Sequence, residues 1–223
     1  MWDYYYIMLR SLLRKQHFIR SFSRMSIPKP ENAMILGSGC CAIVTLRKFQ
    51  GKYIAVKEFT TDREEMEEEL EAIHKIGKGP NPNIAEYFGY NPDAMEIYMK
   101  YYPLTLKNSI FDCLDYDQVT PILSGLVKAV HYCNSKSVSH NDIKANNVLV
   151  NHFTPYLCDF GSTIQGGTKR TLRKNYRSIC KILYQRSNHN AFHTHPRSEQ
   201  LFVALEKIAS DNYSDQYIKQ ILM

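Results

Sequence analysis

The feature that most constrains the fold is the separation of strand-like and helix-like segments along the chain. Residues 34–59 and 85–101 contain short β-branched and aromatic runs between turn residues, a pattern typical of strands. Between them, residues 62–76 repeat apolar side chains at spacings of three and four, which predicts an amphipathic helix. Helical patterns predominate after residue 119. We therefore expect an α+β chain with two lobes and a cleft between them.

The second half of the chain begins with the strongest helical pattern, at residues 119–135. A polar loop follows, and then two short strand-like runs at 148–150 and 156–158. Further helices are predicted at residues 179–184, 201–208 and 217–222.

The charge is concentrated at the N-terminus. Residues 1–30 hold six basic side chains and one acidic side chain, so most of the net charge of +6 lies there. The rest is close to neutral, and nucleic-acid binding is not expected. We interpret residues 1–26 as a basic extension that is disordered. The alternatives are a mitochondrial transit peptide, an arm that lies on a membrane or partner, and a stretch upstream of a start at Met25.

The six cysteines are scattered and form no CxxC pair, so neither a zinc site nor a disulfide framework is predicted. This usage fits a reducing compartment inside the cell, either cytoplasm or nucleus. No apolar run approaches the roughly 18 residues that a membrane-spanning helix needs.

A glycine-containing turn, Gly37-Ser38-Gly39, separates two predicted strands. Glycines let backbone amides approach phosphate oxygens closely, because no Cβ atom intervenes. The alternative is an ordinary hairpin, and Ala42 stands where a third glycine of GxGxxG would be. The absence of a GK[ST] sequence disfavours a P-loop nucleotide-binding protein.

Lys57 ends the strand-like run Tyr53-Ile54-Ala55-Val56. An ammonium group at the end of a buried strand needs a partner, and the glutamate-rich face of the helix at 62–76 offers several. The alternative is a lysine that reaches solvent with its end group.

The loop at residues 140–147 places a carboxylate, a cation and amides close together, as Asp142, Lys144 and Asn147. In phosphoryl transfer a carboxylate accepts the hydroxyl proton, a cation steadies the phosphate and an amide oxygen binds Mg²⁺. Asp159 follows the next predicted strand and can present an oxygen to a hard metal ion. Taken singly, each group also suits a turn.

In chain order, these segments resemble the signature set of the eukaryotic-type protein kinase family: a glycine-rich loop, AVK, a glutamate-bearing helix, HNDIKANN and DFG. The resemblance covers residues from about 28 to 184. It implies a bilobal fold with a five-stranded antiparallel sheet and one helix in the N-lobe, and a shortened, mainly helical C-lobe. We expect the kinase domain at residues 27–223, with the N-lobe at about 27–99, a hinge at 100–102 and the C-lobe at 103–223.

The resemblance also implies roles for single residues. ATP would be bound by the residues Gly37, Ser38, Gly39, Val44, Ala55, Lys57, Met99, Tyr101 and Leu149. Lys57 would pair with Glu69, with Glu68 and Glu65 as the next choices. Asp142 would be the catalytic base and Lys144 a phosphate contact. Asn147 and Asp159 would be the Mg²⁺ ligands. Lys144 is typical of the Ser/Thr-kinase loop.

Three features depart from the family pattern. Asn141 replaces the arginine that normally meets a phosphorylated activation loop. No APE sequence is visible. Asn175 stands where the aspartate of the central C-lobe helix belongs, and only about fifteen residues would then separate Gly161 from that helix. The short segment resembles atypical minimal kinases such as the RIO family and compact viral kinases, and action in a virus-infected host cell is one interpretation.

From these patterns we expect a monomeric Ser/Thr protein kinase of the EC 2.7.11 class that uses ATP, Mg²⁺ and protein substrates. The alternatives are a kinase-like binding or decoy module with weak catalysis, and a small-molecule kinase of the aminoglycoside or choline type. Two further patterns carry less weight. His189, His193 and His195 lack acidic or cysteine partners for a metal, and Cys40-Cys41 is either a redox-sensitive pair or a pair of small apolar residues.

Overall fold

A computed structural model describes residues 23–77, 83–187 and 198–209. The described residues fall into two compact units. Residues 23–77 and 85–102 make the first unit, and residues 83–84, 103–187 and 198–209 make the second.

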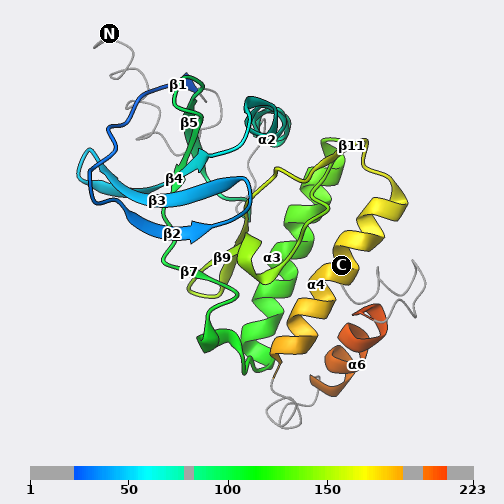
Figure 1. The fold of residues 1–223 in the computed structure, drawn as a ribbon. Coiled ribbons are helices and arrows are strands. Elements are labelled where there is room, and N and C mark those ends of the chain that lie inside the picture. The colour runs from blue at the N-terminus through cyan, green and yellow to red at the C-terminus, as the bar shows by residue number, and fades with distance from the viewer. Residues whose placement is uncertain (1–22, 78–82, 188–197, 210–223) are drawn as a thin grey trace. The chain divides into compact units, whose positions relative to one another are not determined.

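The first unit is a sheet with one long helix (Figure 1). Its sheet has six strands in the order β1-β5-β6-β4-β3-β2. The elements are β1 (Ser23–Arg24), β2 (Met34–Ser38), β3 (Ala42–Phe49), β4 (Lys52–Phe59), α2 (Arg63–Ile76), β5 (Tyr87–Asn91) and β6 (Glu96–Lys100). The predicted five antiparallel strands, β2 to β6, are confirmed.

The sixth strand is β1, which the sequence analysis did not predict. Its two residues pair in parallel with β5, with Ser23 opposite Gly89 and Arg24 opposite Tyr90. This strand lies within the segment that was expected to be a disordered extension. Two residues are too few to show an alternating pattern, which explains why the sequence gives no sign of the strand.

The segment after β1 covers one face of the sheet. Ile27 packs with Ile54, Val56 and Tyr98 into a buried apolar cluster. Next to this cluster, Arg47 has no exposed side-chain surface. This face of the first unit is therefore closed by its own N-terminal segment, and it holds a charged side chain in the interior.

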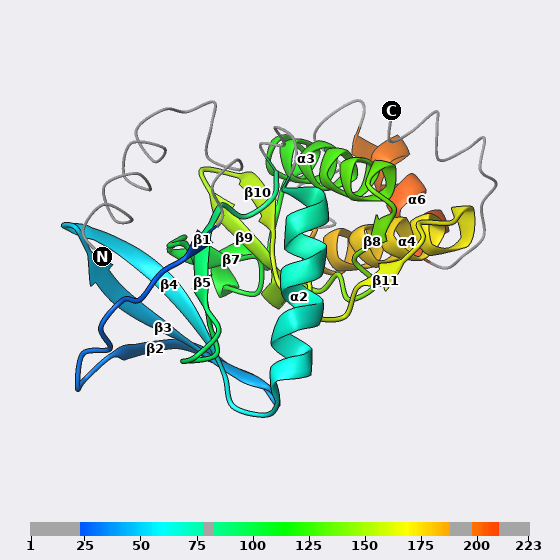
Figure 2. The ribbon, with the colours of Figure 1, turned by 90° about the horizontal axis from the view of Figure 1, so that it is seen from above.

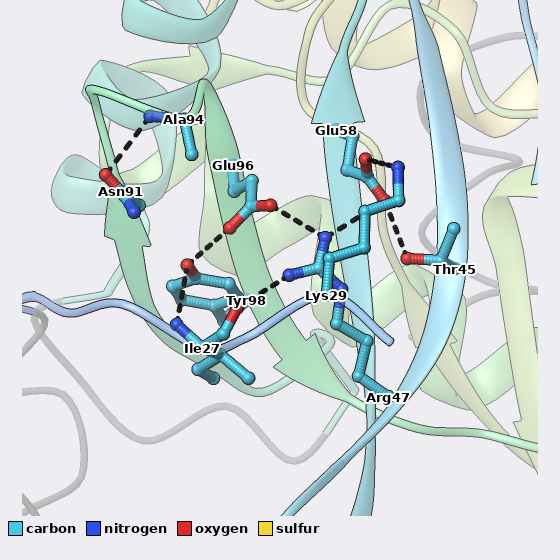
Figure 3. Close-up of polar contacts among 9 residues, drawn as sticks. All are labelled: Ile27, Lys29, Thr45, Arg47, Glu58, Asn91, Ala94, Glu96 and Tyr98. Atoms are coloured by element: carbon cyan, nitrogen blue, oxygen red, sulfur yellow. Dashed lines mark hydrogen bonds and ion pairs between the residues drawn. The ribbon is translucent and has the colours of Figure 1, made fainter. Parts of the chain in front are cut away.

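Figure 3 shows how Arg47 is paired. Its guanidinium lies 2.7 Å from Glu96 Oε1 and 3.0 Å from Glu58 Oε1, and it donates to the Ile27 carbonyl oxygen at 2.8 Å. Burial disfavours the charged form of Glu58, yet hydrogen bonds from Lys29, Thr45 and Arg47 outweigh it and lower the pKa of this carboxyl group.

Helix α2 begins and ends where the sequence predicts. The Asp62 side chain accepts a hydrogen bond from the Glu65 backbone N–H at 3.1 Å and so caps the first turn. The helix ends at Gly77, and it buries its apolar side chains together with a single glutamate, Glu69. That buried carboxylate is the part of α2 that bears on function.

The second unit is mainly helical, and α3, α4 and α6 lie side by side in it (Figures 1 and 2). Two small sheets accompany the helices, in the orders β10-β9-β7 and β11-β8. The elements are β7 (Leu104–Thr105), a 3-10 turn (Ser109–Phe111), α3 (Tyr116–Ser135), β8 (Val138–Ser139), a 3-10 turn (Ala145–Asn147), β9 (Val148–Asn151), β10 (Thr154–Leu157), β11 (Ile164–Gln165), α4 (Lys169–Arg186) and α6 (Ser198–Ala209).

Two helices start earlier than the sequence patterns indicate, because polar caps set their first turns. α3 starts at Tyr116, where Asp115 and Gln118 form a reciprocal capping box. α4 starts at Lys169 after its cap, Thr168, and not at Asn175. Residues 162–168 are therefore all that joins Gly161 to this helix, about half of the separation that the sequence analysis expected.

Among the helices that the structure describes, none is both long enough and apolar enough to span a membrane. The three histidines that were considered as metal ligands, His189, His193 and His195, lie outside the described residues.

Candidate active site

Lys57 and Glu69 form a buried ion pair in the first unit. Lys57 Nζ lies 2.5 Å from Glu69 Oε2, and the Glu69 side chain has no exposed surface. Glu69 is the helix glutamate that the sequence analysis named first. Glu68 is exposed, and Glu65 lies in the first turn, where it accepts a hydrogen bond from Thr61. A buried carboxylate requires a cation, so this pair fixes the lysine ammonium at one place against the sheet.

The residues expected to hold an adenine ring share one face of the sheet. Val44 lies opposite Lys57 in the β3–β4 pair, and Ala55 lies opposite Met99 in the β4–β6 pair. Directly opposed residues point to the same side of a sheet, so these side chains line one surface with the lysine. Ala55 and Met99 are buried and Val44 is half-buried. Tyr101 follows β6, and its ring meets Tyr53 edge-on.

The glycine-containing turn joins β2 to β3. Gly39 N–H donates to the Ala42 carbonyl oxygen at 2.9 Å, which closes the turn. A Cβ atom placed on Gly37 would have no neighbour within 4 Å, so the folded chain itself does not require glycine there. Ser38 is exposed beside it. The open space over this backbone suits a ligand that approaches closely, such as a phosphate group.

The Cys41 thiol lies beside the Cys40 thiol in the turn that joins β2 to β3. Cys40 Sγ and Cys41 Sγ lie 2.9 Å apart, and hydrogen bonds with Cys40 and Glu65 raise the pKa of Cys41 to about 12. A thiol with such a pKa carries little thiolate at neutral pH, and thiolate is the form that reacts.

In the second unit, Asp142, Lys144 and Asn147 form one hydrogen-bonded group. Lys144 Nζ lies 2.6 Å from Asp142 Oδ2, and Asn147 Nδ2 donates to the same oxygen at 3.1 Å. Asn147 Nδ2 also donates to the Asp142 carbonyl oxygen at 3.0 Å. The amide nitrogen of Asn147 is therefore turned inward, so its amide oxygen is the atom suited to a cation. Both side-chain contacts to Asp142 fall on Oδ2, so Oδ1 is the oxygen suited to a substrate hydroxyl.

His140 connects this loop to the segment that carries Asp159. Its Nε2 lies 3.0 Å from the Cys158 carbonyl oxygen, and its ring lies 4.9 Å from the Phe160 ring, centroid to centroid. The Cys158 backbone N–H also donates to the Asn147 carbonyl oxygen at 3.0 Å. These contacts hold Asp159 in a defined place relative to the loop at 140–147.

Burial of His140 lowers the pKa of its imidazole, even though Asp159 and Asp142 act in the opposite direction. A neutral ring carries one proton, and the Cys158 carbonyl oxygen places that proton on Nε2. His140 has no role among the residues predicted from the sequence, although its position two residues before Asp142 is a signal for one.

Asn175 of α4 supports the same loop from the other side. Its Oδ1 accepts from the Asn141 backbone N–H at 3.2 Å, and its Nδ2 donates to Ser139 Oγ at 3.1 Å. Lys174 Nζ donates to Asn141 Oδ1 at 2.5 Å. Asn141 and Asp159 both have positive φ angles, of 63° and 66°, a left-handed conformation that Asn and Asp adopt more readily than most residues with side chains.

The structure therefore brings the predicted residues together in two groups. In the first unit, Lys57 and Glu69 are paired beside Val44, Ala55 and Met99. In the second unit, the loop residues and Asp159 are held together, while Leu149 is half-buried in β9.

The donors in the second group fit a hard divalent cation. The amide oxygen of Asn147 and the carboxylate of Asp159 are the oxygen ligands that Mg²⁺ prefers, and no thiolate or imidazole competes from these two positions. Mg²⁺ takes few protein ligands because it retains water or phosphate oxygens, so two oxygen donors are a fitting number.

A family model described as "Protein kinase domain" matches residues 31–216 of this chain. The serine/threonine-protein kinase pakG of Dictyostelium discoideum is 32% identical over 144 residues, which cover 59% of this chain and 12% of pakG. The protein kinase gsk31 of Schizosaccharomyces pombe is 31% identical over 150 residues, which cover 59% of this chain and 39% of gsk31. Mitogen-activated protein kinase kinase kinase 13-B of Xenopus laevis is 30% identical over 145 residues, which cover 61% of this chain and 14% of that kinase. The chain thus spans well under half of each of these relatives.

Proposed function

Because the chain belongs to the protein kinase domain family, we propose that it transfers the γ-phosphate of MgATP to serine and threonine hydroxyls of proteins, as an enzyme of the EC 2.7.11 class. The observation that carries the proposal is the pairing of Lys57 with a fully buried Glu69. Burying an ion pair of this kind costs desolvation energy, and the packing of a helix on a sheet does not require such a pair. The pair does hold an ammonium group at a fixed position.

In the first unit, we assign Lys57 to the α- and β-phosphates. Gly37, Ser38 and Gly39 would cover the phosphates with backbone amides. Val44, Ala55 and Met99 would contact the adenine ring, together with Tyr101. The apolar character of these side chains suits a flat aromatic ring.

In the second unit, Asp142 Oδ1 would accept the proton of the substrate hydroxyl, since Oδ2 is engaged by Lys144 and Asn147. Lys144 would contact the transferred phosphate with its ammonium group. The neutral His140 would keep the loop and Asp159 in register without adding charge. Positioning of groups that are already in place lowers the barrier, because no reorganisation is needed at the moment of reaction.

Asn147 and Asp159 would hold Mg²⁺. When bound, the ion neutralises phosphate charge that develops during transfer. The inward turn of the Asn147 amide nitrogen supports this assignment, because it leaves the amide oxygen as the atom suited to the cation.

Lys144 supports serine and threonine as acceptors, because a lysine two residues after the catalytic aspartate is typical of Ser/Thr-kinase loops. The first relatives reported above are also named as serine/threonine or protein kinases. The six free thiols support action in a reducing compartment.

The test is transfer of radiolabelled γ-phosphate from MgATP by the purified full chain, with a generic protein mixture and a panel of small molecules as acceptors. We expect label in protein serine and threonine. Lys57→Met and Asp159→Asn should each reduce transfer by about 100-fold or more, because each removes charge stabilisation of the transferred group. Lys52→Met, at an exposed lysine of the same strand, should leave transfer unchanged.

Two results would replace this proposal. Label found only in small molecules would identify a kinase of the aminoglycoside or choline type, for which the short segment at 162–168 would suffice. Nucleotide binding without any transfer would identify a kinase-like binding module.

A further inference from the structure

Helix α4 has an unusual charge. Its eighteen residues include seven basic side chains and no acidic one. Four of them, Arg170, Lys174, Arg177 and Lys181, follow one another at steps of four, three and four residues, so they lie along one face of the helix. All four are exposed. We call these four residues the basic stripe.

The basic stripe borders a hollow between α4 and α6, which lie side by side in Figure 1. A cavity of about 580 Å³ is lined by Lys174, Arg177, Ser178, Lys181, Tyr184, Gln185 and Glu206. Glu206 is the one acidic side chain among these described lining residues, and its Oε1 accepts from the Tyr184 hydroxyl at 3.4 Å. The walls of this hollow therefore carry an excess of positive charge, which favours an anionic occupant.

The basic stripe is joined to the loop at residues 140–147 through its second residue, Lys174. Lys174 Nζ donates to Asn141 Oδ1, and Asn141 immediately precedes Asp142. All of these residues belong to the same compact unit. An occupant of the stripe thus lies next to the loop to which a substrate hydroxyl must come.

The length of the basic stripe fits a short stretch of polypeptide. Eleven helical steps from Arg170 to Lys181 extend roughly 16 Å. An extended peptide spans the same distance with about five residues. A substrate protein can therefore reach the loop with its acceptor residue while a few acidic residues beside the acceptor lie along α4.

We propose that the basic stripe docks an aspartate- and glutamate-rich segment of the protein substrate, adjacent to the serine or threonine that is phosphorylated. This inference rests on the proposed function, because it names the substrate class of the same site. Among the described residues, only the seven at 162–168 join Gly161 to α4, so no long segment between them lies over the basic stripe. Charge complementarity of this kind favours encounter with acidic substrates and selects against basic ones.

The experiment compares two serine peptides of equal length, one with five acidic residues beside the acceptor and one with five neutral residues. The variant is Arg177→Glu with Lys181→Glu in the full chain. Its control is Lys48→Glu with Lys52→Glu, which makes the same change of charge at exposed positions of the β3–β4 hairpin in the other unit. We expect the stripe variant to raise KM for the acidic peptide by about tenfold or more. Its kcat, its KM for ATP and its KM for the neutral peptide should stay unchanged, as should every value for the control.

Several outcomes would overturn the inference. One is equal KM values for both peptides with the unaltered chain. Another is an equal loss for both peptides in the stripe variant, which indicates a structural role of α4. A third is a variant that still binds the acidic peptide but has lost single-stranded DNA, which identifies a nucleic-acid surface.

A direct binding measurement separates this inference from the proposed function. If the chain transfers phosphate to no protein, the proposed function fails, and anisotropy of the fluorescently labelled acidic peptide still tests docking. Binding that the stripe variant loses and the hairpin control keeps would support the basic stripe as an acidic-peptide site. Absence of binding by the unaltered chain would refute it.

Discussion

Arg47 joins the N-terminal segment to one face of the sheet through buried polar contacts. Its side chain is fully buried, and it meets two carboxylates and the Ile27 carbonyl oxygen. Glu58 is shared, because Lys29 contacts its other oxygen at 2.5 Å from a side chain that is 56% exposed. The same carboxylate therefore has one buried and one exposed partner, which allows their contributions to be compared directly.

We predict that Arg47→Met lowers the free energy of unfolding by about 3–5 kcal/mol, because it leaves Glu96 and Glu58 without their buried cation. Lys29→Met should cost at most about 1 kcal/mol, since solvent screens an exposed pair. Urea unfolding of the two variants measures both changes. Equal losses would contradict this prediction, because they would show that the buried Arg47 contributes no more to stability than the exposed Lys29.

Asn175 is the residue through which α4 holds the catalytic loop. It accepts from the Asn141 backbone N–H and donates to Ser139 Oγ, and it is buried. Asn175→Leu should lower the free energy of unfolding by about 1–3 kcal/mol through two unsatisfied polar groups. It should also reduce kcat, because Asp142 follows Asn141 directly.

The matched variant is Asn175→Asp, which keeps an oxygen acceptor for the Asn141 N–H and can accept from the Ser139 hydroxyl. Thermal unfolding and phosphate transfer should both stay near those of the unaltered chain. A similar loss of kcat in both variants would mean that Asn175 acts through something other than its contact with the loop.

At the scale of elements, α3 and β10 pack at a distance that only glycine permits. A Cβ atom on Gly125 would lie 2.5 Å from Pro155 Cγ and 2.7 Å from Asn83 Nδ2. Asn83 in turn donates to the Pro155 carbonyl oxygen at 3.0 Å, so neither neighbour can move freely. Helix propensity favours alanine over glycine by about 1 kcal/mol, and here packing opposes it.

We therefore predict that Gly125→Ala destabilises the chain by about 1–3 kcal/mol, despite the better helix former. Pro155→Ala removes Cγ and Cδ, two of the three atoms nearest to that Cβ, so the double variant should recover part of the loss. A double-mutant cycle from urea unfolding measures that coupling. A stabilising Gly125→Ala would show that β10 yields and that the close approach is not a constraint.

The elements also show how far the sequence alone leads. The five antiparallel strands and α2 carry clear periods and a cap at Asp62, so their pattern was sufficient. The residues of both groups of the site could also be predicted, because each group comes from short motifs that are contiguous along the chain.

Other contacts could not be predicted, because they join residues that are far apart in the sequence. The strand β1 has two residues, and its pairing depends on a partner sixty-six positions away, as between Ser23 and Gly89. Buried Arg47 looks like any strand lysine or arginine until its partners from β4 and β6 are known. Likewise, the role of Asn175 depends on a loop that precedes it by more than thirty residues.

At the scale of the whole molecule, buried titratable groups limit the pH range of stability on both sides. Burial lowers the pKa of His131 from 6.5, and burial raises the pKa of Cys133 and of Cys180 from 9.0 to about 12. Below pH 6.5 the unfolded chain binds a proton at histidine that the folded chain resists. Above pH 9 the unfolded chain releases thiol protons that the folded chain retains. In both directions the unfolded state is favoured.

We predict that the free energy of unfolding is greatest between about pH 6.5 and 9 and falls on either side, by up to about 1.4 kcal/mol per pH unit for each group. Urea unfolding under reducing conditions from pH 5 to 10 measures the curve. His131→Gln retains a partner for the Tyr176 hydroxyl and should flatten the acid side, while Cys180→Ala should flatten only the alkaline side. His140, which is buried, keeps some acid slope in both variants. If His131→Gln left the acid side as steep as before, the loss of stability below pH 6.5 would have to come from His140 and the carboxylates, and His131 would titrate alike in the folded and unfolded chains.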